Sequence, residues 1–176
     1  MTRERSLPFA SLLFVLVVCV DYGHARDISG TISTTLTITE DSKLVGDVTC
    51  TVSGLPCIAL AASGITLDLN GFAITGLGNA QTGCGGGPST FAFVANAEHG
   101  ILVNEQTGVT IRGPGLVQQF RGPGIFVLNS NSVTVTGVTA STNCLSGILF
   151  ASGSNHRIEG NVAVRNGNGT FPCGGI

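Results

Sequence analysis

The chain has little charge and few of the side chains that most often carry chemistry. Only 10% of its 176 residues are Asp, Glu, Lys or Arg, and the net charge at pH 7 is −2. This balance gives no electrostatic case for nucleic-acid binding. The sequence also has no Trp, one Met and three His, and it lacks a Cys-x-x-Cys pair. We therefore expect no zinc site, and no other metal or cofactor.

A long apolar run is also missing. Leu7–Val20 is uncharged and mostly apolar, but it is shorter than the ~20 residues that a membrane helix needs. It follows Arg3 and Arg5, and Gly23–Ala25 has small residues at its two ends, as a cleavage site requires. Residues 1–25 are therefore predicted to be a signal peptide, with a membrane anchor as the alternative. The mature protein is expected to be secreted or periplasmic, with no stable membrane span.

The sequence is instead rich in glycine, with 26 residues, and it contains a repeat. Glycine followed by isoleucine opens a short apolar run at intervals of 24 and then 23 residues, at Gly100, Gly124 and Gly147. A second run follows each time and ends in another glycine, at Gly113, Gly137 and Gly160. A fixed period of this size, built from extended patterns, predicts a stacked β-solenoid.

Alternation along the second run predicts which side chains face the core, because successive side chains of a strand point to opposite faces. Two inward columns are expected, one with Leu69, Ile111, Val135 and Ile158, the other with Leu67, Val109, Val133 and His156. Two outward columns are expected as well, one with Asp68, Thr110, Thr134 and Arg157, the other with Asn70, Arg112, Thr136 and Glu159. Gln119, Asn143 and Asn166 are predicted to form an amide ladder in a turn.

The period divides the mature chain into two parts. Residues 26–57 are predicted to form an N-terminal β cap, and residues 58–176 a parallel β-helix of about four coils. An insertion at 77–96 breaks the period and contains Cys84 followed by three consecutive glycines. Insertions in solenoids emerge as loops on one face, so this one is either a functional loop or a passive one.

A family resemblance supports this architecture. Gly64–Gly71, followed by Ile74-Thr75-Gly76, resembles the opening coil of exported bacterial right-handed parallel β-helix proteins, the NosD-like and pectin-lyase-like group. Asn155–Asn161 is similar to the later repeats of that group. The resemblance covers about residues 58–176 and implies an all-β, right-handed parallel β-helix. Members usually continue for more coils, so a truncated chain is one interpretation. The group includes lyases, hydrolases, epimerases and proteins without known activity, so function does not follow from it.

The sequence offers no catalytic constellation. A calcium-assisted lyase needs clustered acids and a basic residue, yet no two acids share an outward column on adjacent coils. A hydrolase of this fold needs two or three neighbouring aspartates, and Asp68 is the only one in the coils. His156 is expected to be a buried core residue and His99 an ordinary loop residue, with a base role as the alternative for each. We predict no catalytic residues.

Binding is the more favoured interpretation. Asp68, Arg112, Arg157 and Glu159 are expected to form a polar outer face, and Arg121 repeats the Arg-Gly-Pro-Gly motif of Arg112. We expect a non-catalytic binding or scaffold protein with a polysaccharide as its partner. One alternative is a polysaccharide lyase or hydrolase whose site is incomplete in this chain, and another is a structural or adhesion repeat. The uncapped C-terminal coil predicts self-association.

Five cysteines remain after cleavage, an odd number, and export permits disulfides. Cys144 and Cys173 both precede a Gly-Ile strand, one coil apart, and stacked coils would bring them within disulfide range. We therefore predict a Cys144–Cys173 disulfide, together with Cys50–Cys57. Cys84 would be left over.

Overall fold

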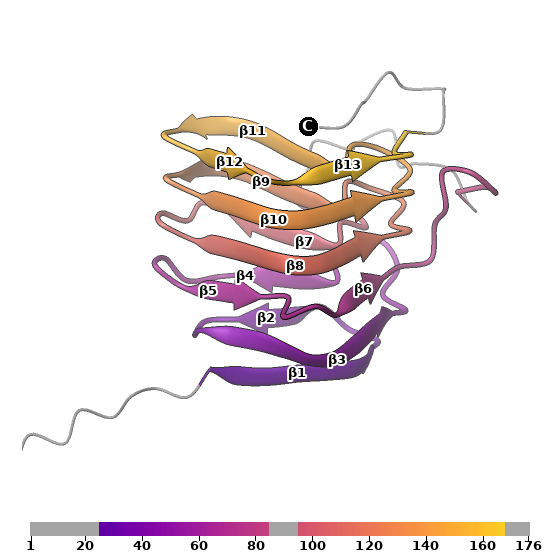
Figure 1. Ribbon diagram of the computed structural model, residues 1–176, viewed down its shortest axis with the longest axis horizontal. Coiled ribbons are helices and arrows are strands. Elements are labelled where there is room, and N and C mark those ends of the chain that lie inside the picture. Colours follow the sequence, from indigo (N-terminus) through magenta and orange to yellow (C-terminus); the bar gives the residue numbers. More distant parts are fainter. Residues whose placement is uncertain (1–24, 85–94, 168–176) are drawn as a thin grey trace, which may run out of the picture.

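The structure is a computed structural model that describes residues 25–84 and 95–167. Figure 1 shows a stack of coils, with β1 at one end and β11, β12 and β13 at the other. The described residues contain strands and no helix, so nothing among them could cross a membrane as a helix. The predicted all-β parallel β-helix is confirmed. Most of the predicted signal peptide, Cys173 and ten residues of the insertion lie outside the described residues.

Thirteen strands of the described residues form two parallel sheets. Sheet A contains β1 (Arg26–Ile32), β3 (Ser42–Cys50), β5 (Thr66–Asp68), β6 (Ala73–Thr75), β8 (Thr110–Gln118), β10 (Thr134–Ser141), β12 (Arg157–Glu159) and β13 (Val162–Val164). Sheet B contains β2 (Leu36–Ile38), β4 (Ile58–Leu60), β7 (Ile101–Asn104), β9 (Ile125–Asn131) and β11 (Ile148–Ser154). The chain alternates between the sheets, which is the topology of a β-helix.

Residues 26–57, for which we expect a cap, have the same two-sheet geometry as the coils. β1 pairs with β3 in sheet A, and β2 pairs with β4 in sheet B, in both cases in parallel. The segment therefore adds coils of its own rather than a separate layer over the first one. β1 is the end strand of sheet A, and its only strand partner among the described residues is β3.

The second and third runs of a coil merge in the middle of the stack. β8 and β10 are each continuous where the sequence suggests two strands, whereas the same path is divided into β5 and β6 below and β12 and β13 above. The register between β8 and β10 shifts where Thr136 faces Arg112 and Val138 faces Gly115. Gly137 has a φ of +66° there, and a Cβ on Gly113 would overlap its carbonyl oxygen. Glycine thus lets the strands bend without ending.

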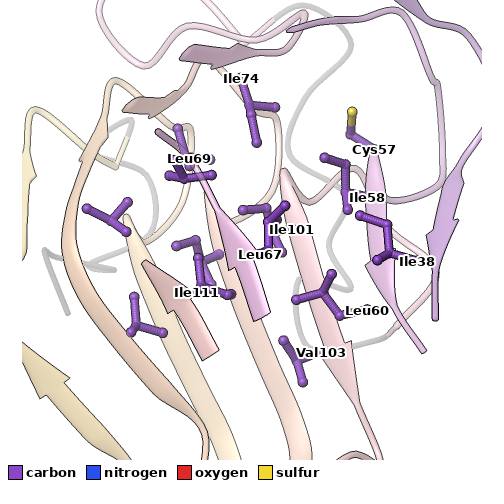
Figure 2. Packing of buried hydrophobic residues seen from close by; sticks show 14 of the residues in the cluster. Ile38, Cys57, Ile58, Leu60, Leu67, Leu69, Ile74, Ile101, Val103 and Ile111 are labelled. Carbon is purple, nitrogen blue, oxygen red and sulfur yellow. The ribbon is translucent and has the colours of Figure 1, made fainter. Parts of the chain in front are cut away.

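The core is a set of aliphatic columns that run along the stack between the two sheets. Leu67 faces Ile111, which faces Val135, and all three are fully buried. Ile158 continues this column in the last coil, where it is 39% exposed. Opposite them, the column in sheet B contains Ile38, Leu60, Val103 and Val127. Figure 2 shows side chains of both sheets pointing into this common interior.

One predicted register is wrong in the first coil. Leu67, and not Leu69, faces Ile111, so Ile65 rather than Leu67 continues the neighbouring column. The prediction placed the glycines that end each second run opposite one another. In the structure the strand residues before those glycines pair instead, and they lie at different distances from the glycine in the two coils. Leu69 is still fully buried, because it occupies the space that a side chain on Gly115 would need.

Asn143 and Asn166 form the predicted amide ladder, but Gln119 is not part of it. Asn143 is fully buried, and its Nδ2 donates to Oδ1 of Asn166 at 3.0 Å and to the carbonyl of Val117 at 3.2 Å. Asn143 Oδ1 accepts a hydrogen bond from the backbone N–H of Phe120 at 3.1 Å. Phe120 therefore occupies the ladder position where Gln119 was predicted, because the bend in β8 moves the register by one residue.

Candidate functional site

The outward side of β1, β3, β5, β8, β10 and β12 carries two adjacent columns of polar side chains, which we call the polar face. The first column contains Thr66, Thr110, Thr134 and Arg157. The second column contains Asp27, Lys43, Asp68, Arg112, Thr136 and Glu159. Adjacent coils of a parallel sheet lie ~4.8 Å apart, so members of one column are close neighbours.

The charges of the polar face neutralise one another. Arg112 binds Oδ2 of Asp68 through Nε at 2.8 Å and Nη2 at 2.7 Å, and Asp68 Oδ1 accepts the backbone N–H of Asn70. Asp68 and Arg112 were predicted in different columns, and the observed register makes them partners. Arg157 Nε lies 2.7 Å from Glu159 Oε1, and this hydrogen bond lowers the pKa of Glu159. The structure therefore brings together four of the five predicted binding residues, as two ion pairs.

The threonine hydroxyls of the polar face are uncommitted. Thr66, Thr110 and Thr134 are half-buried on consecutive coils. Within residues 25–84 and 95–167, no hydrogen bond uses the hydroxyl of any of the three. Hydroxyls both donate and accept, so the row offers polar partners to a ligand without breaking an internal contact. Thr110 and Thr134 were predicted to point outward, but their pattern does not signal a site, because threonine is also an ordinary strand residue.

Arg121 lies in a different place from the other predicted binding residues. It precedes β9, and its Nη1 donates to Glu98 Oε2 at 2.9 Å and to Oε1 at 3.2 Å. Glu98 Oε1 also accepts hydrogen bonds from Ser53 Oγ at 2.9 Å and the backbone N–H of Gly54 at 2.7 Å. We call these four residues the Glu98 cluster. No motif signals it, since its members lie far apart in the sequence.

The Glu98 cluster joins three turns of the stack. The Arg121 and Glu98 side chains are 24% and 16% exposed. Burial alone would raise the pKa of Glu98, but the hydrogen bonds from Arg121, Gly54 and Ser53 and the charge of Arg121 outweigh it, so that the pKa is lowered. The carboxylate is thus ionised and fully engaged, which fits a structural connection rather than a proton-transfer group.

The described cysteines form two disulfides. The predicted Cys50–Cys57 bond is present. The predicted Cys144–Cys173 bond is wrong, because Cys144 is bonded to Cys84 instead. Spacing alone could not show this, since it depends on where the insertion folds.

The first part of the insertion, residues 77–84, runs along the stack, and we call it the strap. The N–H of Gly78 donates to the carbonyl of Gln119 at 2.6 Å, and the N–H of Ala80 donates to the carbonyl of Thr142 at 3.0 Å. Gln81 Nε2 donates to the carbonyl of Arg165 at 3.3 Å. Gln119, Thr142 and Arg165 all have positive φ, of 60°, 53° and 57°, and occupy equivalent turns. The strap therefore binds one carbonyl in each of three consecutive coils.

Metal-ligating side chains do not gather among the described residues. No group of three or more His, Cys, Asp or Glu side chains in this part of the chain could hold a metal ion. His99 and His156 each lie against a phenylalanine ring, Phe126 and Phe150, with centroids 4.7 and 4.6 Å apart. Nδ1 of His156 accepts the backbone N–H of Val133 at 3.3 Å.

Comparison with known proteins gives one finding. A family model described as periplasmic copper-binding protein (NosD) matches residues 63–173. No curated protein and no solved structure matches the chain. The matched range begins just before β5 and includes every later strand of the β-helix.

Proposed function

Since the chain belongs to the NosD family, we propose that it is a non-catalytic binding or scaffold protein whose polar face takes carbohydrate. The observation that carries the proposal is the composition of that face. Its hydroxyls are uncommitted, whereas its acids and bases are paired with each other. A neutral, hydroxyl-rich ligand could bind there without displacing an ion pair.

The protein is secreted or periplasmic. The matching family is described as periplasmic, and the two disulfides fit an oxidising compartment. Such a compartment also contains the polysaccharides of the cell exterior, which is consistent with the proposed ligand class.

A non-catalytic role is supported by the state of the carboxylates. Asp68 is held by Arg112, Glu159 by Arg157 and Glu98 by Arg121. A glycosidase needs two carboxyl groups facing one bond, and a general base needs a carboxylate ready to take a proton. Salt-bridged carboxylates on separate coils do not supply either arrangement.

Copper, named in the description of the family, does not fit the donors of the oxidised chain. All four cysteines that the structure describes are in disulfides, and only the thiolate form ligates copper. The two described histidines lie in different turns of the stack, and neither belongs to a group of three or more His, Cys, Asp or Glu side chains among the described residues that could hold a metal ion. Copper is therefore given no role in the proposed carbohydrate function.

A glycan array, followed by calorimetric titration of any ligand found, tests the proposal. The double variant Thr110→Val, Thr134→Val keeps the β-branched shape and removes two hydroxyls of the polar face. We expect it to weaken binding at least tenfold, since each lost hydrogen bond contributes ~1 kcal/mol. Thr37→Val, on the exposed outer side of β2 in sheet B, is the matched control and should bind like the wild type. A wild-type protein that binds no glycan would contradict the proposal.

A further inference from the structure

The two ends of the stack, at β1 and at β12 (Figure 1), differ in how well they cover the core. At one end, Ile28 and Ile32 of β1 and Ile38 of β2 are buried, and neither strand has an exposed large apolar side chain. At the other end, Ile158 of β12 is 39% exposed, whereas Val135, which faces it from the previous coil, is fully buried. The column of core side chains is therefore closed at the β1 end and open at the β12 end.

We propose that the β12 end pairs with the β12 end of a second copy of this chain, in a dimer with a two-fold axis at Ile158. Contact between the same ends covers two exposed isoleucines at once. Head-to-tail contact would instead place Ile158 against the closed β1 end, which has no exposed large apolar side chain to bury in return. The dimer fixes which residues face each other, and it does not rest on carbohydrate binding.

The backbone of β12 has hydrogen-bonding groups on its outer edge. The N–H of Arg157 donates to the carbonyl of Val133 in the previous coil at 2.9 Å. Backbone groups of successive strand residues point to opposite edges, so the N–H and C=O of Ile158 point away from β10, and β12 is the last strand on that path of sheet A. Two opposed residues of this kind exchange both of their hydrogen bonds in an antiparallel pair. Ile158 and its counterpart in the second copy therefore match in backbone as well as in side chain.

The charges beside Ile158 also fit a two-fold axis. Arg157 and Glu159 flank it on the outward side, and Arg157 Nε lies 2.7 Å from Glu159 Oε1. Rotation about the axis places Arg157 of each copy opposite Glu159 of the other, because a two-fold interface is self-complementary. Four charges of alternating sign then surround the axis, and opposite charges face each other across the strands.

Disulfide trapping with introduced cysteines tests the register. The variants Arg157→Cys and Glu159→Cys are made in a Cys173→Ser background, because the four cysteines that the structure describes are bonded to each other and Cys173 is not among them. Facing residues of an antiparallel pair lie within disulfide range. An equal mixture of the two variants, oxidised with diamide, should therefore yield several-fold more linked dimer on a non-reducing gel than either variant alone.

A matched pair of variants probes the closed end. Asp27→Cys and Ser29→Cys flank Ile28 in β1, as the first pair flanks Ile158 in β12, and both positions are exposed. Their mixture should not link above the level of either variant alone. If the mixture of β12 variants linked no better than each of them alone, the proposed register would be overturned. Preferential linking at β1 would overturn the choice of end.

Light scattering of the Cys173→Ser chain measures the number of copies. The mass should level off at two chains, since a two-fold interface uses the same surface on both copies and leaves none for a third. Ile158→Lys should shift the mass to one chain, and Val45→Lys, which replaces an exposed valine of β3, should leave the dimer intact. A mass that keeps growing with concentration would indicate head-to-tail contact and refute the dimer, as would a monomer at all concentrations.

Discussion

Glu98 stabilises the stack from a single side chain, because its carboxylate accepts hydrogen bonds from two other turns. We expect Glu98→Gln to lower the free energy of unfolding at neutral pH by ~1–3 kcal/mol, because the part-buried guanidinium of Arg121 and the backbone N–H of Gly54 lose their charged acceptor. Urea unfolding of both proteins measures the difference. The exposed pair offers a control, since Glu159→Gln should change stability far less.

The stabilisation by Glu98 should depend on pH. Its pKa is lower in the folded protein than the ordinary value of about 4.3, so its contribution is complete above that value. The contribution is lost as the pH falls through the lowered, folded-state pKa. The difference in stability between the wild type and Glu98→Gln should therefore shrink on acidification below about pH 4. A difference that stays constant to low pH would contradict this assignment.

The glycines before β7 and β9, Gly100 and Gly124, are required by close stacking of the turns. A Cβ on Gly124 would lie 2.7 Å from the carbonyl oxygen of Gly147 and 2.7 Å from Asn143 Nδ2. We expect Gly124→Ala to destabilise the fold by ~1–3 kcal/mol, as overpacking does. Gly46→Ala is the milder control, since its Cβ would meet only the Ser29 side chain, at 3.1 Å. Equal melting temperatures for the two variants would argue against tight stacking.

At the scale of elements, the asparagine ladder ties successive turns together. Asn143→Ala would leave the N–H of Phe120 and the carbonyl of Val117 without their buried partner. Each orphaned group costs ~1–3 kcal/mol, so we expect at least ~2 kcal/mol of destabilisation in chemical unfolding. Asn161→Ala removes a similar pair of hydrogen bonds in the last coil, where the side chain is half-buried. Asn161→Ala should therefore destabilise the fold less than Asn143→Ala. A larger loss of stability for Asn161→Ala would contradict the stabilising role of the ladder.

The strands were predictable from the sequence because side-chain alternation and coil period reinforce each other. Ile111 and Val135 were correctly placed in one buried column. Leu69 was misplaced because the number of residues between a strand and its glycine varies from coil to coil. Leu67 and Leu69 are two residues apart, so the alternation of side chains fits either of them equally well. Only the pairing of Leu67 with Ile111 in the structure decides the register.

At the scale of the whole molecule, the disulfides should contribute unequally to stability. Cys84–Cys144 joins residues 60 apart, whereas Cys50–Cys57 joins residues 7 apart. In the chain-entropy model, removing the disulfide that closes the long loop lowers the free energy of unfolding by ~4 kcal/mol. Removing the one that closes the short loop lowers it by ~2 kcal/mol. Unfolding of the two paired serine variants measures both values. A larger loss for Cys50→Ser, Cys57→Ser would show that core packing outweighs loop entropy.

Self-association is proposed for the far end of the stack. Ile158 is 39% exposed there, and Val162 and Val164 are 52% and 42% exposed. The register places these two valines outward, in columns that hold Thr139 and Ser141 one coil earlier. Apolar groups on an edge strand favour pairing with a second copy. Light scattering should detect association in the wild type and a monomer in Val164→Lys. A monodisperse wild-type monomer would contradict the proposal.

The part of the molecule that sequence reasoning could not supply is the path of the insertion. Cys84 was predicted to have no disulfide partner, because it lies in the insertion, where the repeat period is interrupted. Arg121 was grouped with Arg112 by motif, yet the two lie in different surroundings, because Arg112 lies in β8 just before its bend and Arg121 lies in the turn before β9. Long-range contacts of this kind depend on how a loop lies over the coils, which strand patterns do not encode.

The strap also limits how such a protein can evolve in length. Repeats usually grow or shrink by duplication or deletion of whole units, and most positions in the stack would accept such a change. Deleting the coil between Gln119 and Thr142 would move Cys144 by one coil relative to Cys84. The hydrogen-bond donors of the strap would then no longer align with the carbonyls that they bind. Among the described residues, no hydrogen bond of the strap reaches beyond Arg165. Length variation among descendants should therefore accumulate there, while the spanned units keep a fixed count.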